Sequence, residues 1–222
     1  MKDKCGMKIK DGTSGLNSGF TYIELLIVTA LFSVIISSIY TLLTANIKVY
    51  SSQGNTMAMT QGVRAALVIM TKDMKMAKYD PTGNAGACII TADISEFKFQ
   101  IDWNENGTIL SSSSDPSEEL RYALSPDENR DGIADESPSK IGLASWAGGL
   151  QPVVEDITKL EFTYYDKENN VLTPLPLSSE NIEKIKSIEI LIISETPNPD
   201  PILNVKKSKT ITTRVMLRNS GL

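Results

Sequence analysis

The pattern of apolar and polar positions along this 222-residue chain falls into three zones. Residues 25–47 carry no charged side chain and are mostly apolar. About 20 such residues are enough for a helix to cross a bilayer. Residues 46–78 become polar without a proline, and an alternating pattern typical of strands begins after Pro81. The pattern therefore predicts a membrane helix, a polar continuation of that helix and a β-rich region.

The middle zone keeps one apolar face. Val63, Leu67, Met70 and Met74 recur at spacings of four, three and four, which is the period of a helix. We therefore predict one long helix within residues 20–78, from Thr21 to about Ala77, with residues 25–47 as its transmembrane part and a bend near Gly54. The proline and glycine of residues 79–83 end it. The apolar face is expected to belong to a core and not to a ligand site.

Residues 82–222 are predicted to form a β-rich head. Alternating apolar side chains indicate strands around residues 94–102, 119–124, 160–164, 188–193 and 211–217. Residues 166–170 read as a hairpin turn. Strands and helices do not alternate in the predicted order, so a parallel nucleotide-binding sheet is not expected. The predicted fold class is α+β, with a long N-terminal helix packed on a largely antiparallel sheet.

Composition removes most catalytic chemistry. The chain contains no histidine, which excludes Ser-His-Asp and Cys-His nucleophile systems and every histidine-ligated metal site. The two cysteines are Cys5 and Cys88, and the second is expected to be a small buried residue. A membrane-anchored enzyme whose catalytic groups are all carboxylates is the remaining alternative, but nothing in the sequence places two acids across a cleft. We expect no enzymatic activity and no nucleic-acid binding.

Residues 1–19 are a short polar leader with four lysines and two aspartates, and the whole chain has a formal net charge of −5. An ordinary secretory signal has its apolar region before the cleavage point, whereas here it follows. The basic leader predicts that the N-terminus stays cytoplasmic and that the rest of the chain crosses. Removing the leader would leave a chain of charge −7 without Cys5, and hence without an internal disulfide.

Glu24 is the one charge at the start of the apolar zone. A carboxylate in a membrane segment is costly and indicates a functional partner. If the chain is cut after Gly19, Phe20 becomes the N-terminus and its ammonium lies four residues before Glu24, on the same helix face. Glu24 could then pair with its own amine or with that of a neighbouring copy. The simpler alternative is a signal anchor with an unpaired acid.

These residues resemble a known family. Residues 19–28, Gly-Phe-Thr-Tyr-Ile-Glu-Leu-Leu-Ile-Val, are similar to the type IV prepilin cleavage and methylation motif, with Tyr22 where leucine is usual. The resemblance implies cleavage after Gly19 by prepilin peptidase, N-methylation of Phe20 and a role for Glu24 in docking subunits. The motif alone does not distinguish between major pilins, minor pilins and secretion-system pseudopilins.

A looser resemblance covers most of the chain. The helix end at residues 72–83, the Leu-Arg-Tyr strand, residues 154–166 and residues 214–219 resemble PilW-type minor pilins. The J-type minor pseudopilins of type II secretion share much of this layout. The resemblance implies a type IV pilin-like fold and a low-abundance subunit that primes or caps a filament. Its implied partners are other pilins or pseudopilins and an inner-membrane assembly platform, and its implied location is the inner membrane with the head in the periplasm.

Two loops could hold a cation. Residues 127–136 begin like an EF-hand calcium loop, with oxygen ligands at alternate positions and Gly132 for the turn, but Pro138 stands where a bidentate glutamate is expected. The candidate ligands are Asp127, Asn129, Asp131, the carbonyl of Ile133, Asp135 and Glu136. Residues 102–107 repeat the alternation with fewer charges, and a hairpin turn is the simpler account. A membrane-anchored calcium-binding adhesion or sensing module is therefore the alternative function.

Overall fold

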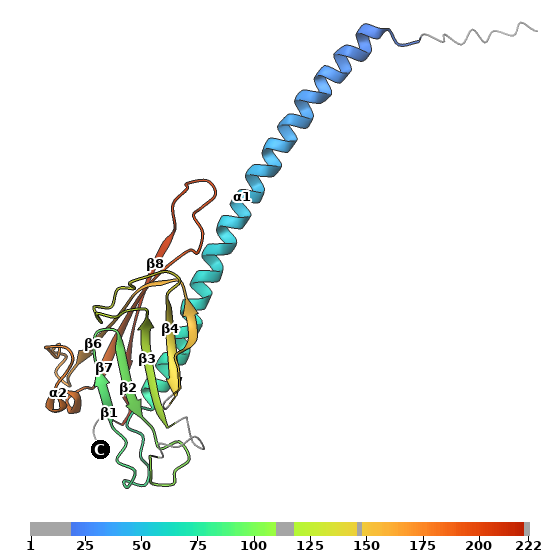
Figure 1. Ribbon diagram of the computed structural model, residues 1–222. Helices are drawn as coiled ribbons and strands as arrows, with labels where there is room; N and C mark the ends of the chain where they lie inside the picture. Colours follow the sequence, from blue (N-terminus) through green and yellow to red (C-terminus); the bar gives the residue numbers. More distant parts are fainter. Residues whose placement is uncertain (1–18, 110–117, 146–147, 220–222) are drawn as a thin grey trace, which may run out of the picture. The chain divides into compact units, whose positions relative to one another are not determined.

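The computed structural model describes residues 19–109, 118–145 and 148–219 (Figure 1). The chain divides into two compact units, Met1–Ile47 and Lys48–Leu222. Ile47 is also the last residue of the uncharged zone in the sequence. The leader up to residue 18, with Cys5, lies outside the described residues.

Helix α1 (Tyr22–Lys75) continues through Gly54 and Gly62 without a break. The residues predicted to form its apolar face, Val63, Leu67, Met70 and Met74, are all buried in the core of the second unit, which confirms that prediction. The helix ends slightly before Ala77. Lys78 adopts a positive φ of 63° and donates its N–H to the carbonyl of Gln100, so the chain leaves the helix to join the head.

A five-stranded antiparallel sheet forms one part of the head. Its order is β1-β2-β3-β4-β5, and its strands are β1 (Ile89–Ala92), β2 (Glu96–Gln100), β3 (Glu119–Ser125), β4 (Lys140–Ser145) and β5 (Gln151–Glu155). The sequence predicted β2, although too long, and β3, whereas β1, β4 and β5 were missed. Cys88, just before β1, is half-buried rather than buried, and its Sγ lies 3.4 Å from Oε1 of Gln100.

A three-stranded antiparallel sheet forms the other part, in the order β6-β7-β8. Its strands are β6 (Ile157–Tyr165), β7 (Ser187–Glu195) and β8 (Ser208–Met216), and all were predicted. The expected turn at residues 166–170 forms, with the Asp166 carboxylate accepting the N–H groups of Glu168 and Asn170. It leads only to an isolated bridge between Tyr165 and Val171, because the chain then passes through α2 (Ser179–Glu183) before β7.

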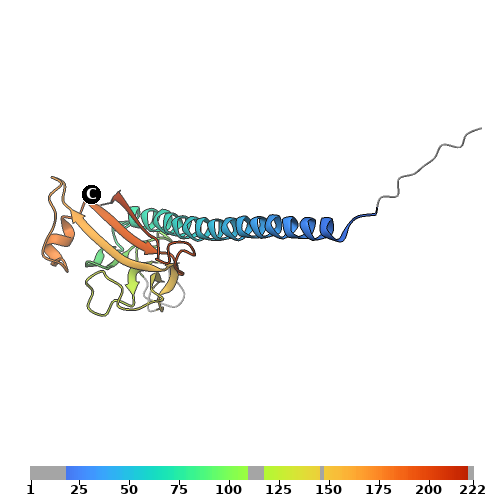
Figure 2. The same cartoon turned by 90° about the horizontal axis from the view of Figure 1, so that it is seen from above.

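The core lies between the second half of α1 and the two sheets (Figures 1 and 2). Phe97 of β2 contacts Phe99 on its own strand and Phe162 and Tyr164 of β6, with neighbouring ring centroids 5.0–6.5 Å apart. The Tyr122 hydroxyl of β3 donates to Oδ2 of Asp73 on the helix at 2.6 Å. The predicted α+β fold, a long helix packed on antiparallel sheet structure, is confirmed, with two sheets in place of one.

Candidate functional site

The bond predicted to be cleaved lies outside regular structure. Gly19 and Phe20 precede α1, and the Phe20 side chain is 90% exposed. Among the described residues, apart from Gly19 and its chain neighbours, no heavy atom lies within 4 Å of the position that a Cβ on Gly19 would occupy. A protease needs accessible, non-helical backbone, and this segment provides it.

Thr21 and Glu24 form a reciprocal cap at the start of α1. Glu24 Oε2 accepts the backbone N–H and the hydroxyl of Thr21, both at 2.9 Å, and Thr21 Oγ1 accepts the N–H of Glu24 at 3.3 Å. This is a capping box, which satisfies backbone donors that a helix start leaves free. Glu24 therefore has a partner before any amine is available. The Thr-x-x-Glu pattern ahead of an apolar run could have revealed this cap in the sequence.

The first part of α1 presents apolar side chains outward. In the part of the chain that the structure describes, α1 is the one helix long and apolar enough to cross a membrane. Most of its polar side chains bond to the helix's own carbonyls. The donors include Thr29, Ser33, Ser38, Thr41, Thr44 and Asn46. Because a polar group without a partner is costly in hydrocarbon, these internal bonds suit a lipid or helix-bundle environment.

The loop at residues 127–136 turns its side-chain oxygens onto its own backbone. Asp127 Oδ2 accepts the N–H of Gly132 at 3.1 Å, Asn129 Oδ1 that of Asp131 at 3.1 Å, and Asp131 Oδ1 that of Ile133 at 2.8 Å. Asp135 Oδ2 accepts the N–H of Glu128 at 2.6 Å, and Glu136 is exposed. The turn brings the side chains of Asn129 and Asp131 together, with Asn129 Nδ2 donating to Asp131 Oδ2 at 2.9 Å. Among the described residues there is no group of three or more acidic or cysteine side chains placed to hold a metal ion.

The same loop is fixed tightly against β6. Ala134 donates its N–H to the carbonyl of Thr158, and Leu160 donates to that of Gly132. Gly132 has a φ of +83°, and a Cβ there would lie 2.5 Å from the Leu160 carbonyl oxygen. Gly132 therefore serves a close backbone approach as well as a turn. Calcium binding by this loop stays a prediction.

The loop at residues 102–107 repeats this geometry. The buried Asp102 accepts the N–H groups of Asn106 and Gly107 at 3.2 and 3.1 Å, and Asn106 Oδ1 accepts that of Thr108 at 2.8 Å. Glu105 and Gly107 have positive φ values, as Arg130 and Gly132 do in the first loop. The two loops thus share one Asx-rich turn, which their matching sequence pattern explains. Residues 110–117, including the serine run, lie outside the described part.

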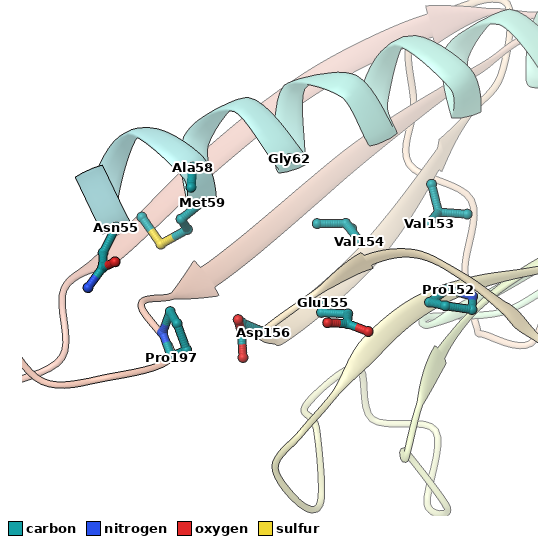
Figure 3. A pocket seen from close by; sticks show the side chains of 10 residues that line it. All are labelled: Asn55, Ala58, Met59, Gly62, Pro152, Val153, Val154, Glu155, Asp156 and Pro197. Atoms are coloured by element: carbon teal, nitrogen blue, oxygen red, sulfur yellow. The ribbon is translucent and has the colours of Figure 1, made fainter. Parts of the chain in front are cut away.

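A shallow groove of about 410 Å³ lies in the head between α1 and β5. Figure 3 shows Asn55 and Met59 extending from the helix toward Asp156 and Pro197. The lining is mostly apolar, and the acids that border it are Glu155 and Asp156. Nothing in its lining joins a nucleophile to a base, so the groove suits contact with another surface better than catalysis.

No protein-family model and no curated protein sequence matches this chain. A solved structure that resembles it is a type IV-like pilin from Thermus thermophilus, with 6% sequence identity and a TM-score of 0.44. The match covers 73% of this chain and 98% of that one. At this level of similarity, function has to be argued from the chain's own residues.

Proposed function

We propose that this chain is a pilin-type structural subunit. One observation carries the proposal: a single helix, α1, is apolar and exposed along its first part and supplies core residues of a β-rich head along its second. Exposed apolar area of this extent needs lipid or a partner helix to cover it. A continuous helix lets the same apolar surface serve as an anchor before assembly and as a packing surface afterwards.

The more specific role we propose is a minor pilin or pseudopilin, which primes or caps a type IV pilus or a type II secretion pseudopilus. Its support is the motif at residues 19–28 and the looser likeness of the head to PilW-type subunits. Prepilin peptidase would cut the accessible bond after Gly19, and Phe20 would then be N-methylated. The role is structural, with no catalytic step.

Glu24 is the proposed assembly residue. In the uncut chain it caps α1 through Thr21. In a bundle of apolar helices neither a carboxylate nor a free terminal ammonium is tolerated alone, so the two charges favour each other. We propose that Glu24 exchanges the Thr21 cap for the terminal amine of a neighbouring subunit when the helix enters the filament.

Location and partners follow from this role. The chain would span the inner membrane once, through residues 25–47, with its head in the periplasm, and would later join a pilus or pseudopilus. Its partners would be prepilin peptidase, other major and minor pilins or pseudopilins, and the inner-membrane assembly platform. The apolar first part of α1 and its internally bonded polar side chains support the membrane stage.

The test is the intact mass and N-terminal residue of the protein purified from its native membrane. We expect a chain that begins at N-methyl-Phe20. Gly19→Val should leave the uncut precursor, whereas Gly15→Val, which changes another leader glycine, should be processed normally. An unprocessed chain beginning at Met1 in cells with an active peptidase would overturn the assigned site and the proposal with it.

A further inference from the structure

The turn between β7 and β8 carries an exposed apolar surface that the proposed function does not use. We call residues 200–206 the β7–β8 tip. Ile202, Leu203 and Val205 are 57%, 63% and 56% exposed there. Three neighbouring apolar side chains held in solvent are unfavourable unless something covers them.

Hydrogen bonds around Asp200 fix the conformation of the tip. Asp200 Oδ1 accepts the N–H groups of Ile202 and Leu203 at 2.8 and 3.0 Å. The Asp200 backbone bonds to both Asn204 and Val205 at 2.8 Å, and Asn204 has a φ of 54°. The backbone of the tip is thereby held around one buried carboxylate, and this arrangement keeps the three apolar side chains outward.

The same carboxylate fixes the tip to α1. Ser52 donates its hydroxyl to Asp200 Oδ2 at 2.5 Å, and Lys207 Nζ lies 2.6 Å from that oxygen and 2.7 Å from Ser52 Oγ. Ser52 and Asp200 are both buried. In Figures 1 and 2 the β7–β8 turn accordingly lies beside α1. Ser52 follows Ile47, the end of the uncharged zone, by five residues, which reach at most about 18 Å even when extended.

Cations flank the apolar side chains. Lys206 and Lys209 are exposed, and neither takes part in any ion pair found among the described residues. Lys48 is also exposed and precedes Ser52 by four residues, so it lies on the helix face that meets the tip. Apolar side chains beside exposed lysines are the composition that binds at the surface of an anionic bilayer.

We propose that the β7–β8 tip is a membrane-contact element. Ile202, Leu203 and Val205 enter the headgroup region of an anionic bilayer, and Lys206 and Lys209 meet lipid phosphates. The inference rests on the membrane-anchored state of the proposed function. A stable protein partner is less favoured because it usually covers about 800 Å² on each side, far more than three side chains offer.

The test uses the full chain reconstituted in phosphatidylcholine vesicles with and without phosphatidylglycerol. In a Cys5→Ser, Cys88→Ser background, single cysteines replace Leu203, Met216 or Ile35 and carry an environment-sensitive fluorophore. Spin-labelled lipids quench a fluorophore that enters the bilayer. Met216 is the matched control because it is 72% exposed on β8 of the same hairpin. A fluorophore at position 35 reports whether the transmembrane part of α1 enters the bilayer.

We expect severalfold stronger quenching at position 203 than at position 216, only in vesicles with phosphatidylglycerol, and weaker quenching at high salt. Lys206→Gln with Lys209→Gln should abolish that excess. Quenching at 35 with equal quenching at 203 and 216 would overturn this inference and leave the proposed anchor intact. Absence of quenching at 35 would overturn both. A shift at 203 that depends on protein concentration, without lipid quenching, would assign the tip to a protein contact and refute the proposal.

Discussion

The carboxylate of Glu24 accepts both the backbone N–H and the hydroxyl of Thr21 at 2.9 Å, at the first turn of α1. This pair gives the acid a role in the precursor that is separate from assembly. Gly19 and Phe20 lie outside the helix that this cap begins. Cleavage after Gly19 would leave the cap in place and add an ammonium group beside it, so two partners would then compete for one carboxylate.

Variants at this pair separate charge from capping. Glu24→Ala should be cut and inserted but should enter filaments poorly. Glu24→Gln keeps a side chain that suits the capping box and loses the charge, so we expect it to assemble as poorly as Glu24→Ala. Thr21→Ala keeps the charge at a cost of about 1 kcal/mol in helix capping and should assemble nearly normally. The measurement is the amount of each variant in purified filaments relative to membranes.

Equal cleavage of all three variants, read from the mature mass, is the control for this series. Normal filament incorporation of Glu24→Ala would contradict the pairing hypothesis. Normal incorporation of Glu24→Gln together with failure of Thr21→Ala would assign the effect to the helix cap instead of the charge.

The partly buried hydrogen bond from the Tyr122 hydroxyl to Asp73 should stabilise the head. Burial, together with the bond to Asp73, raises the pKa of the Tyr122 hydroxyl well above its usual value. Tyr122→Phe should lower the free energy of unfolding by about 2 kcal/mol, because a bond from a buried hydroxyl to a carboxylate at the edge of the core is lost. Tyr79→Phe removes an exposed hydrogen bond to Glu105 and is the control, with a smaller loss. Equal losses in urea unfolding would contradict this account.

Gly132 should resist substitution more than an ordinary turn glycine. Gly132→Ala combines a positive φ with a Cβ placed 2.5 Å from the Leu160 carbonyl oxygen, and we expect a loss of about 3 kcal/mol. Gly83 has a φ of +71°, and among the described residues beyond its chain neighbours no heavy atom lies within 4 Å of its Cβ position, so Gly83→Ala should cost about 1 kcal/mol. The difference in thermal unfolding isolates the clash, and equal melting temperatures would refute it.

Asp200 should make the head acid-sensitive. Hydrogen bonds from Lys207, Ser52 and the tip backbone hold the pKa of this carboxyl far below its usual value. A lowered pKa in the folded state contributes stability that is present above the ordinary value near pH 4 and is lost as the pH falls below it. Asp200→Asn should therefore be less stable than the parent at pH 7, with the difference shrinking below pH 4. A difference independent of pH would contradict this assignment.

The sequence predicted the parts of the fold in which side-chain periodicity is strong. Ile188, Ile190 and Ile192 alternate cleanly, and all are buried on β7. β4 gave no such signal because it contains Gly142, whose place is filled by Leu150 from the following loop. β5 contains Pro152, which is tolerated because β5 is an edge strand.

The long-range contacts that position the candidate sites were harder to predict from the sequence. Ser52 and Asp200 are 148 residues apart in the chain, and each is an ordinary polar residue in its own segment. Only the folded head brings them together, so no local pattern could predict the fixed β7–β8 tip. The Thr21–Glu24 cap, in contrast, was readable from four consecutive residues. The charge of Glu24 favours an ammonium partner in the sequence, whereas in the structure its carboxylate accepts from Thr21.

Calcium is the last prediction. Asp127 and Asp131 lie in one turn whose oxygens bond to the loop's own N–H groups, and a cation would recruit their remaining lone pairs. If the loop binds calcium, an excess of 100-fold over the dissociation constant should add about 2.7 kcal/mol to stability. Asp127→Asn with Asp131→Asn should abolish this gain, whereas Asp166→Asn, in a separate exposed turn, should not. Magnesium at the same concentration is the ion control. Unchanged melting of the parent protein in calcium would remove the loop as a cation site.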